Sequence, residues 1–318
     1  MIKLALILMI SLVASCSTAM KGTTVPENGT GPGQTGTEQP TAPGEGPQTP
    51  AFKAFSFIQM SDTQLAFHTG DASDFLTDTL TLDTLVRQIN RLRPPFVLVT
   101  GDMTDNSTNK AQLAAYRKVI DRVDKSIPVH HLPGNHDVGS ACSKAKVAAF
   151  EQNYGPSKFS FTWENCALIG INSCAIFAAN PSSGDPSPEA AEIAEEQYKW
   201  LEQELKSRQD KGARIVFGHY PVFVKSISED RSTNNFSQEE RERYWKLFKQ
   251  YKVAAFGCGH THYPYESSYL GIDAVTCGAV AAPLGKGYRG AELWTVSAEG
   301  KVTHKYLSIQ EFVNLRSL

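Results

Sequence analysis

Short apolar strands that alternate with amphipathic helices begin near Phe52 and continue to the end of this 318-residue chain. Leu76, Leu80, Leu85 and Ile89 fall close to one helical stripe, which predicts a helix. The predicted helices are 75–92, 111–123, 189–209 and 238–251. The predicted strands, with the residues that close them, are 54–60, 96–102, 127–137, 159–163, 166–173, 213–221 and 253–262, followed by hairpins within 265–280 and 291–309. This alternation is typical of an α/β fold with β-rich additions toward the C-terminus.

Five polar clusters stand where predicted strands end. They are Asp62-Thr63-Gln64, "GDMTD" at 101–105, "GNHD" at 134–137, "GHYP" at 218–221 and "GHTH" at 259–262. A glycine opens each of the last four clusters, which suits a sharp turn or a close approach of two backbones. Because ligands bind open α/β sheets at the carboxyl ends of the strands, the five clusters are expected to converge on one site.

These clusters carry the side chains that hold transition metals. One "GD" or one "GHYP" is more often an ordinary turn, and His260 and His262 reach one site only if their extended segment bends. The full set is far more specific for a metal site, because five successive strand ends carry, in this order, Asp, Asp, Asn-His, His and His-x-His. Mixed carboxylate, amide and imidazole ligands suit Mn, Fe or Zn better than Ca. The sequence therefore predicts a site for transition-metal ions, whose identity stays open.

With these clusters, the chain resembles the calcineurin-like metallophosphoesterases over nearly all of residues 52–318. The resemblance implies a four-layer sandwich of two mixed β-sheets flanked by helices, and two metal ions bridged by an aspartate and a hydroxide. Asp102 would be that bridge. The remaining ligands implied are Asp62, Gln64 and His262 for one ion, and Asn135, His219 and His260 for the other. His136 would lie beside the substrate phosphate, oriented by Asp105.

Gln64 departs from the common pattern of this family, which has His at that position. The chain is similar in this respect to the calcineurin-like phosphoesterase domain-containing protein 1 group, the complete-type serine/threonine phosphatases, which also carry D-x-Q. A neutral amide oxygen binds a metal more weakly than imidazole does. Asp105 stands where purple acid phosphatases need Tyr, and Asn106 where calcineurin-type phosphatases carry Arg. An iron-tyrosinate site and a guanidinium clamp on the phosphate are therefore not expected.

The reaction implied is hydrolysis of phosphomonoesters, including phosphorylated Ser or Thr of proteins, by attack of a metal-bridging hydroxide. His136 would stabilise developing charge or protonate the leaving group. One alternative is a phosphodiesterase acting on cyclic nucleotides or lipid head groups. Another is a metal-binding lipoprotein that has lost activity through Gln64. Lys225, Lys286 and Arg289 are candidates to assist phosphate binding, although each is more often a solvated surface charge.

The N-terminus reads as a targeting segment. Lys3 precedes a short apolar run that ends in "LVASC", which resembles a bacterial lipobox with cleavage before Cys16. We expect a signal peptide over 1–15, a Gly/Pro/Thr-rich disordered tether over 16–50 and a phosphoesterase domain over 51–318. These expectations place the protein at the bacterial cell envelope, exported and attached to the membrane by a lipid on Cys16.

Composition restricts the partners. The formal net charge is −2, so nothing points toward nucleic acid beyond small nucleotide substrates. None of the six cysteines forms a C-x-x-C pair, which argues against a zinc ribbon. His130 and His131 lie inside a predicted strand and are expected to pack rather than to bind metal. The sequence does not indicate the oligomeric state.

Overall fold

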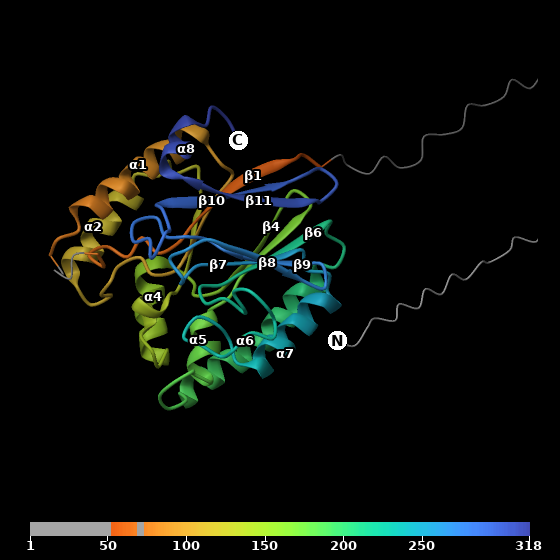
Figure 1. The fold of residues 1–318 in the computed structure, drawn as a ribbon. Helices are drawn as coiled ribbons and strands as arrows, with labels where there is room; N and C mark the ends of the chain where they lie inside the picture. The colour runs from red at the N-terminus through yellow and green to blue at the C-terminus, as the bar shows by residue number, and fades with distance from the viewer. Residues whose placement is uncertain (1–51, 69–72) are drawn as a thin grey trace, which may run out of the picture. The chain divides into compact units, whose positions relative to one another are not determined.

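Two mixed β-sheets pack face to face, and helices cover the outer face of each (Figure 1). The computed structural model describes residues 52–68 and 73–318. The first sheet has the order β11-β10-β1-β2-β3, and its strands are β1 (Phe55–Met60), β2 (Val97–Thr100), β3 (Val129–Leu132), β10 (Gly290–Val296) and β11 (Val302–Ser308). The second has the order β4-β5-β6-β7-β9-β8, with β4 (Phe159–Trp163), β5 (Cys166–Gly170), β6 (Ala213–Phe217), β7 (Ala255–Cys258), β8 (Tyr265–Tyr269) and β9 (Ile272–Thr276). This arrangement confirms the predicted four-layer α/β sandwich.

The strands that precede the five polar clusters run in parallel within each sheet. β1 pairs in parallel with β2, and β2 with β3. In the other sheet β6 pairs in parallel with β5 and β7. Antiparallel strands flank these sets, since β10 pairs with β1 and β8 with β9. The carboxyl ends of β1, β2 and β3 therefore point the same way, as do those of β6 and β7.

The helices divide between the two outer faces. α1 (Leu76–Leu92), α2 (Lys110–Ile120) and α8 (Ile309–Asn314) cover the first sheet (Figure 1). The second sheet is covered by α5 (Ser173–Ala179), α6 (Pro188–Ser207) and α7 (Gln238–Gln250), while α4 (Lys144–Tyr154) contacts α6 and α3 (Asn135–Val138). Side chains of Asn109, Ser143, Ser187 and Ser237 accept main-chain N–H groups at the first turns of α2, α4, α6 and α7.

A buried cluster rich in aromatic side chains fills the space between the sheets. Phe57, Phe217 and Trp294 are fully buried there, and the Phe57 and Trp294 rings stack at 6.1 Å. Along β1, Phe57 faces this cluster, whereas Ile58 and Met60 face the helices. Both faces of β1 are therefore buried, which explains why its sequence reads as a nearly continuous apolar run.

Four helices differ from the sequence expectation: α3, which overlaps the predicted strand segment 127–137, and α4, α5 and α8. α4 was not predicted because Phe150 is its only buried residue, so it has almost no apolar stripe. α5 was not predicted: the predicted strand 166–173 ends at its first residue, five of its seven residues are buried, and no polar face marks a helical period. α8 begins immediately after β11, where Ser308 and Glu311 form a capping box.

Some expectations lie outside the described residues. These are the signal peptide at 1–15, Cys16 and the tether at 16–50. Within 52–68 and 73–318, no helix is both long and apolar enough to cross a membrane. The five cysteines in the described part of the chain are buried free thiols.

Candidate metal centre

The ends of five strands from both sheets meet at one edge of the sandwich. The loop after β1 is tied to the loop after β2, because the Asp62 N–H donates to the Gly101 carbonyl at 3.1 Å and the Gln64 N–H to the Asp102 carbonyl at 2.8 Å. β6 and β7 are tied in the same way, by Gly259 N–H and the His219 carbonyl at 2.9 Å. All seven predicted ligand residues lie on these strand ends.

Glycines permit the close approach. A Cβ atom at Gly134 would lie 2.0 Å from Oδ1 of Asp102, and one at Gly259 would lie 1.8 Å from Oγ of Ser61. A side chain at Gly134 would require the Asp102 main chain to move, and one at Gly259 would displace the Ser61 and Asp62 side chains.

Backbone strain gathers at the same residues. Eleven non-glycine residues of the described chain have positive φ, and five of them are predicted ligands: Asp62, Gln64, Asp102, His260 and His262. Each left-handed residue costs about 1–3 kcal/mol, so such residues persist only where the surroundings enforce them. His260 and His262 thus reach the site through left-handed turns, not through the bent extended segment that the sequence suggested.

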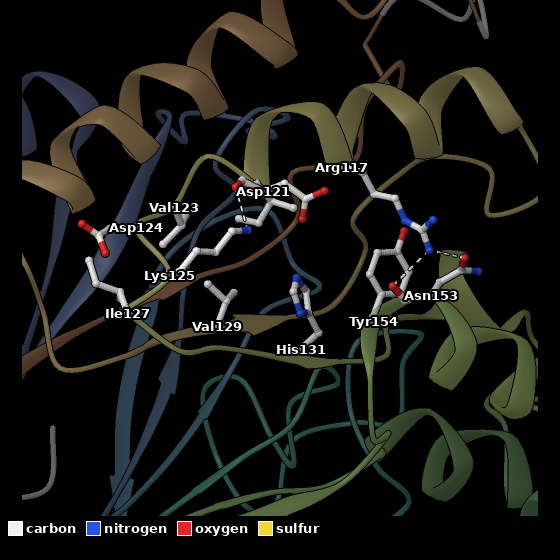
Figure 2. A pocket seen from close by; sticks show the side chains of 11 residues that line it. Arg117, Asp121, Val123, Asp124, Lys125, Ile127, Val129, His131, Asn153 and Tyr154 are labelled. Atoms are coloured by element: carbon white, nitrogen blue, oxygen red, sulfur yellow. Dashed lines mark hydrogen bonds between the residues drawn. The ribbon is translucent and has the colours of Figure 1, made fainter.

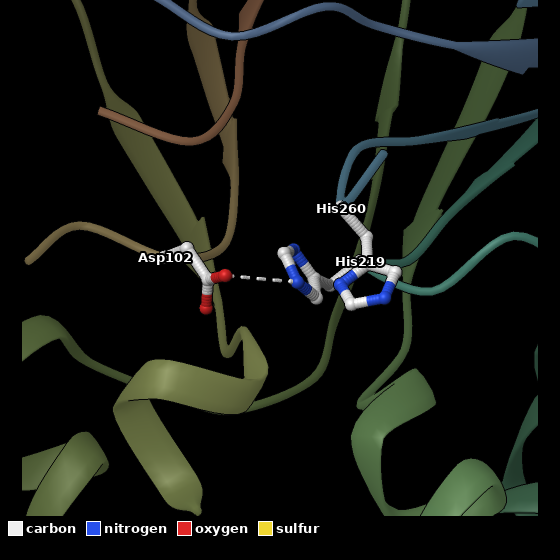
Figure 3. A group of neighbouring side chains, drawn as sticks. All are labelled: Asp102, His219 and His260. Carbon is white, nitrogen blue, oxygen red and sulfur yellow. Dashed lines mark ion pairs between the residues drawn. The ribbon is translucent and has the colours of Figure 1, made fainter. Parts of the chain in front are cut away.

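The ligand side chains form two groups that share Asp102. One contains Asp62, Asp102 and His262, and the other contains Asp102, His219 and His260; in each, candidate ligand atoms lie within 4.8 Å of one another. Figure 3 shows the second group, in which Oδ2 of Asp102 is 3.3 Å from Nε2 of His219. Asn135 completes it, with Oδ1 at 3.0 Å from the same nitrogen. A carboxylate common to two groups is the arrangement that a bridging ligand requires.

Main-chain carbonyls orient all three histidines. Nδ1 of His219 donates to the Thr100 carbonyl at 2.8 Å, and Nδ1 of His262 to the Ala282 carbonyl at 2.5 Å. His260 uses its other nitrogen, since Nε2 donates to the Thr233 carbonyl at 3.0 Å. The carbonyl bond takes one nitrogen of each ring, so the other nitrogen is the one that could bind a metal, as in metal-binding histidines.

Unpartnered acceptors show that these residues fit a cation. Oδ1 of Asp62 and Oε1 of Gln64 are fully buried and accept no hydrogen bond. A buried polar atom without a partner is costly, and a metal ion would satisfy both oxygens. Asp62, Gln64, Asp102 and His262 are therefore able to hold one ion, and Asp102, Asn135, His219 and His260 a second.

Burial and charge act against each other on the ionisable groups. Burial raises the pKa of Asp62. Burial also works to raise the pKa of Asp102, but the His219 imidazole outweighs it and holds that pKa below its usual range. Burial alone would lower the pKa of His219, yet the Asp102 carboxylate raises it to about 9. In the metal-free protein His219 is thus an imidazolium, and a bound cation would replace its proton.

Gln64 also contacts the predicted catalytic residues. Nδ1 of His136 donates to the main-chain carbonyl of Asp105 at 2.7 Å, while the Asp105 carboxylate is more distant, at 3.4 Å. The expectation that this carboxylate orients His136 is therefore modified, because the shorter contact is to the main chain. Nε2 of His136 is 2.9 Å from Nε2 of Gln64.

Asp137 was given no separate role from sequence, although it ends the "GNHD" cluster. One of its carboxylate oxygens accepts the N–H groups of both Asp102 and Gly134 at 2.8 Å. Asp137 thereby fixes the loop that presents Asp102. Ser173 acts similarly, since its hydroxyl accepts the N–H groups of His219 and Tyr220 at 2.7 Å. The carboxylate that closes the "GNHD" cluster was the sequence signal for Asp137; Ser173 left none.

Arg289 and His131 are bonded to groups other than the proposed ligands. Arg289 is tied to the Ala281 carbonyl at 2.8 Å and lies 3.7 Å from Asp78, so its guanidinium is already paired. His131, expected to pack, extends from β3 into a separate pocket of about 440 Å³ beside α2, near Val129 and Tyr154 (Figure 2). Its Nε2 lies 3.0 Å from the Tyr116 hydroxyl.

The fold and this site define a metallophosphoesterase, a hydrolase of phosphoric esters. The chain belongs to the calcineurin-like phosphoesterase family, whose sequence profile matches residues 55–264. It is 29% identical over 273 residues to serine/threonine-protein phosphatase CPPED1 of Bos taurus, covering 81% of this chain and 84% of that protein. It is 30% identical to the probable glycerophosphodiester phosphodiesterase GpdQ of Arcobacter nitrofigilis, over 64% of this chain and 71% of that protein.

A solved structure shares the fold. The dimetal phosphatase from Danio rerio superimposes with a TM-score of 0.57 and 16% identity, covering 80% of this chain and 96% of the other. The similarity to CPPED1 agrees with the group that the D-x-Q pattern indicated.

Proposed function

We propose that this protein hydrolyses phosphomonoesters, including phosphorylated Ser and Thr of proteins, at the centre shared by Asp102. The observation that carries the proposal is the pair of ligand groups with Asp102 in common. The name of the CPPED1 relatives, which match over most of their length, supports a phosphatase. The phosphodiesterase and the inactive metal-binding protein are not favoured.

The roles of the residues follow from their positions. Asp62, Gln64, Asp102 and His262 would hold one ion, and Asp102, Asn135, His219 and His260 the other. Two divalent ions of this kind supply an activated water and positive charge for the phosphoryl oxygens, and Mn, Fe and Zn all suit these ligands. His136, which is about 30% exposed, would donate a hydrogen bond or a proton to the leaving oxygen. Asp105 positions His136.

The test is metal-dependent turnover. Protein purified without chelator and supplied with Mn²⁺ should hydrolyse p-nitrophenyl phosphate, and Asp102→Ala should abolish that activity. Elemental analysis of the wild type should give two ions per chain. Asp210→Ala, an exposed change in the loop before β6, is the control. Equal rates in wild type and Asp102→Ala would overturn the proposal, and faster cleavage of diesters than of monoesters would favour the diesterase.

We also propose that the protein is exported and anchored by a lipid on Cys16. The motif "LVASC" supports this localisation. The protein should partition into the detergent phase, and Cys16→Ser should lose that partitioning. Unchanged partitioning of the variant would contradict the lipid anchor.

A further inference from the structure

A pocket of about 460 Å³ adjoins the candidate metal centre on the side of His260. We call it the His260 pocket. Its lining comes from α3, the segments 140–141 and 181–185, Phe177, Tyr220, Thr233, Asn234 and His260. Asn135 and His260 belong to both the pocket and the proposed ligand set. The volume lies within the range of small-ligand sites. A phosphoester bound at the metal centre would therefore have this space beside it for its leaving group.

Neighbouring groups cover the ring faces of Phe177 and Tyr220 in this pocket. Phe177 and Tyr220 stack in parallel at 4.2 Å, and Tyr220 lies 4.0 Å from the His260 ring. The Arg231 guanidinium covers Phe177 at 4.7 Å and donates to the carbonyls of Asn180 and Asn235. Two groups cannot share one ring face at these separations, so Arg231, Phe177, Tyr220 and His260 form a closed column. A nucleobase would find no free face on Phe177 or Tyr220 on which to stack.

The charge of the lining is also one-sided. Among the described residues, Asp185 is the one carboxylate or cationic side chain that lines the pocket, and it is exposed. Lys225 lines a different pocket, with its amine 5.9 Å from the Tyr265 ring, and Arg289 is paired with Asp78. A leaving group that carries further phosphate or carboxylate would meet Asp185, whereas Arg231, the cation against Phe177, lies outside the lining and donates to the Asn180 and Asn235 carbonyls. An organic cation would meet an opposite charge.

We infer that the His260 pocket receives the leaving group of the substrate, and that Asp185 makes it select a leaving group bearing an ammonium or guanidinium over one bearing extra negative charge. This inference rests on the proposed phosphomonoesterase function and specifies its substrate class. The cation could belong to a basic side chain near a phosphorylated residue in a peptide or to a small phosphorylated amino alcohol. Both present the same chemistry to Asp185.

The experiment compares kcat/KM for two phosphothreonine peptides that differ only in having Lys or Glu beside the phosphorylated residue. Wild type should prefer the Lys peptide about two- to fivefold, the range of an exposed ion pair. Asp185→Lys should reverse the preference, and Asp185→Asn should abolish it. Asp210→Lys, which makes the same change in net charge before β6, should leave it intact. Fluorescence anisotropy of the labelled dephosphorylated peptides reports the same selection without turnover.

Phosphoethanolamine and glycerol phosphate form a second pair that separates the two sources of the cation. If only the preference for the Lys peptide depends on Asp185, the pocket receives peptides. If the preference for phosphoethanolamine over glycerol phosphate also depends on Asp185, the pocket receives small amines as well. If neither pair responds to Asp185→Lys while p-nitrophenyl phosphate is still cleaved, the inference is wrong and the proposed function stands. If no substrate, p-nitrophenyl phosphate included, is cleaved by the metal-loaded wild type, the proposed function itself fails.

Discussion

Gln64 and His136 are joined by a hydrogen bond of 2.9 Å between their Nε2 atoms. Nδ1 of His136 donates to the Asp105 carbonyl, so in this arrangement the Gln64 amide donates to Nε2. That arrangement fixes the amide orientation and leaves Oε1 of Gln64 buried without a partner. His136 can act as the proposed acid only when Nε2 carries a proton and is released from Gln64. One neutral amide therefore connects the proposed metal ligands to the proposed acid, a link that His at this position would make differently.

Replacement of Gln64 should change metal affinity in both directions. Gln64→His should tighten the ion held with Asp62 and His262, because imidazole binds such ions more strongly than an amide oxygen does. Gln64→Ala should weaken that ion at least tenfold, or by about 1.4 kcal/mol. Isothermal titration calorimetry of the metal-free protein with Mn²⁺ measures both changes in affinity.

Gln197→Ala is the matched control, since Gln197 is a buried amide that bonds to Asn172 and not to any proposed ligand. It should lower stability without changing metal affinity. If occupancy is the same in wild type, Gln64→His and Gln64→Ala, then Gln64 is no ligand.

Loss of His136 should slow the hydrolysis of esters with poor leaving groups more than that of esters with good ones. General acid catalysis contributes typically 10²–10⁴-fold, and an alkoxide needs a proton more than p-nitrophenolate does. His136→Ala should therefore reduce kcat for an alkyl phosphate far more than for p-nitrophenyl phosphate. An equal reduction for both substrates would mean that His136 acts by holding Gln64 and not on the leaving group.

The His219–Asp102 pair makes the stability of the metal-free protein depend on pH. The pKa of His219 rises from about 6.5 in the unfolded chain to about 9 in the folded protein. A group whose pKa is raised by folding contributes its full stabilisation at pH values below its pKa in the unfolded chain. That stabilisation is lost as the pH rises through its pKa in the folded protein. Metal-free protein should therefore lose on the order of 3 kcal/mol between about pH 6.5 and 9.

Metal-loaded protein should not show this slope, because the bound cation replaces the His219 proton. Metal uptake near pH 7.5 should consequently release a proton. Calorimetry in buffers of different ionisation enthalpy counts that proton, and His219→Asn should remove both the proton release and the pH slope. A flat stability profile for the metal-free wild type would contradict the assignment of His219 as an imidazolium.

The regular parts of this fold were predictable because their residues alternate in character. The strands β1, β2, β6 and β7 are apolar runs closed by a polar cluster, which a Gly opens after β2, β6 and β7, so their ends and their convergence followed from the sequence. α5 escaped detection because it is buried on nearly every side. The Gln64–His136 hydrogen bond and the Arg231–His260 column depend on side chains brought together from distant loops, which periodicity does not encode.

Gly134 should be intolerant of any side chain. A Cβ atom there would lie 2.0 Å from Oδ1 and 2.3 Å from the main-chain nitrogen of Asp102, so Asp102 would have to move. Gly134→Ala should cost about 1–3 kcal/mol of stability, as overpacking does, and should also weaken binding of both ions, because Asp102 is common to the two ligand groups. Thermal unfolding and metal titration on the same preparation separate the two effects.

Gly271→Ala is the control: its φ of 76° strains an alanine, but no atom lies within 4 Å of the added carbon. It should lower stability and leave both metal affinities unchanged. Full metal binding by Gly134→Ala would show that Asp102 does not depend on this close approach.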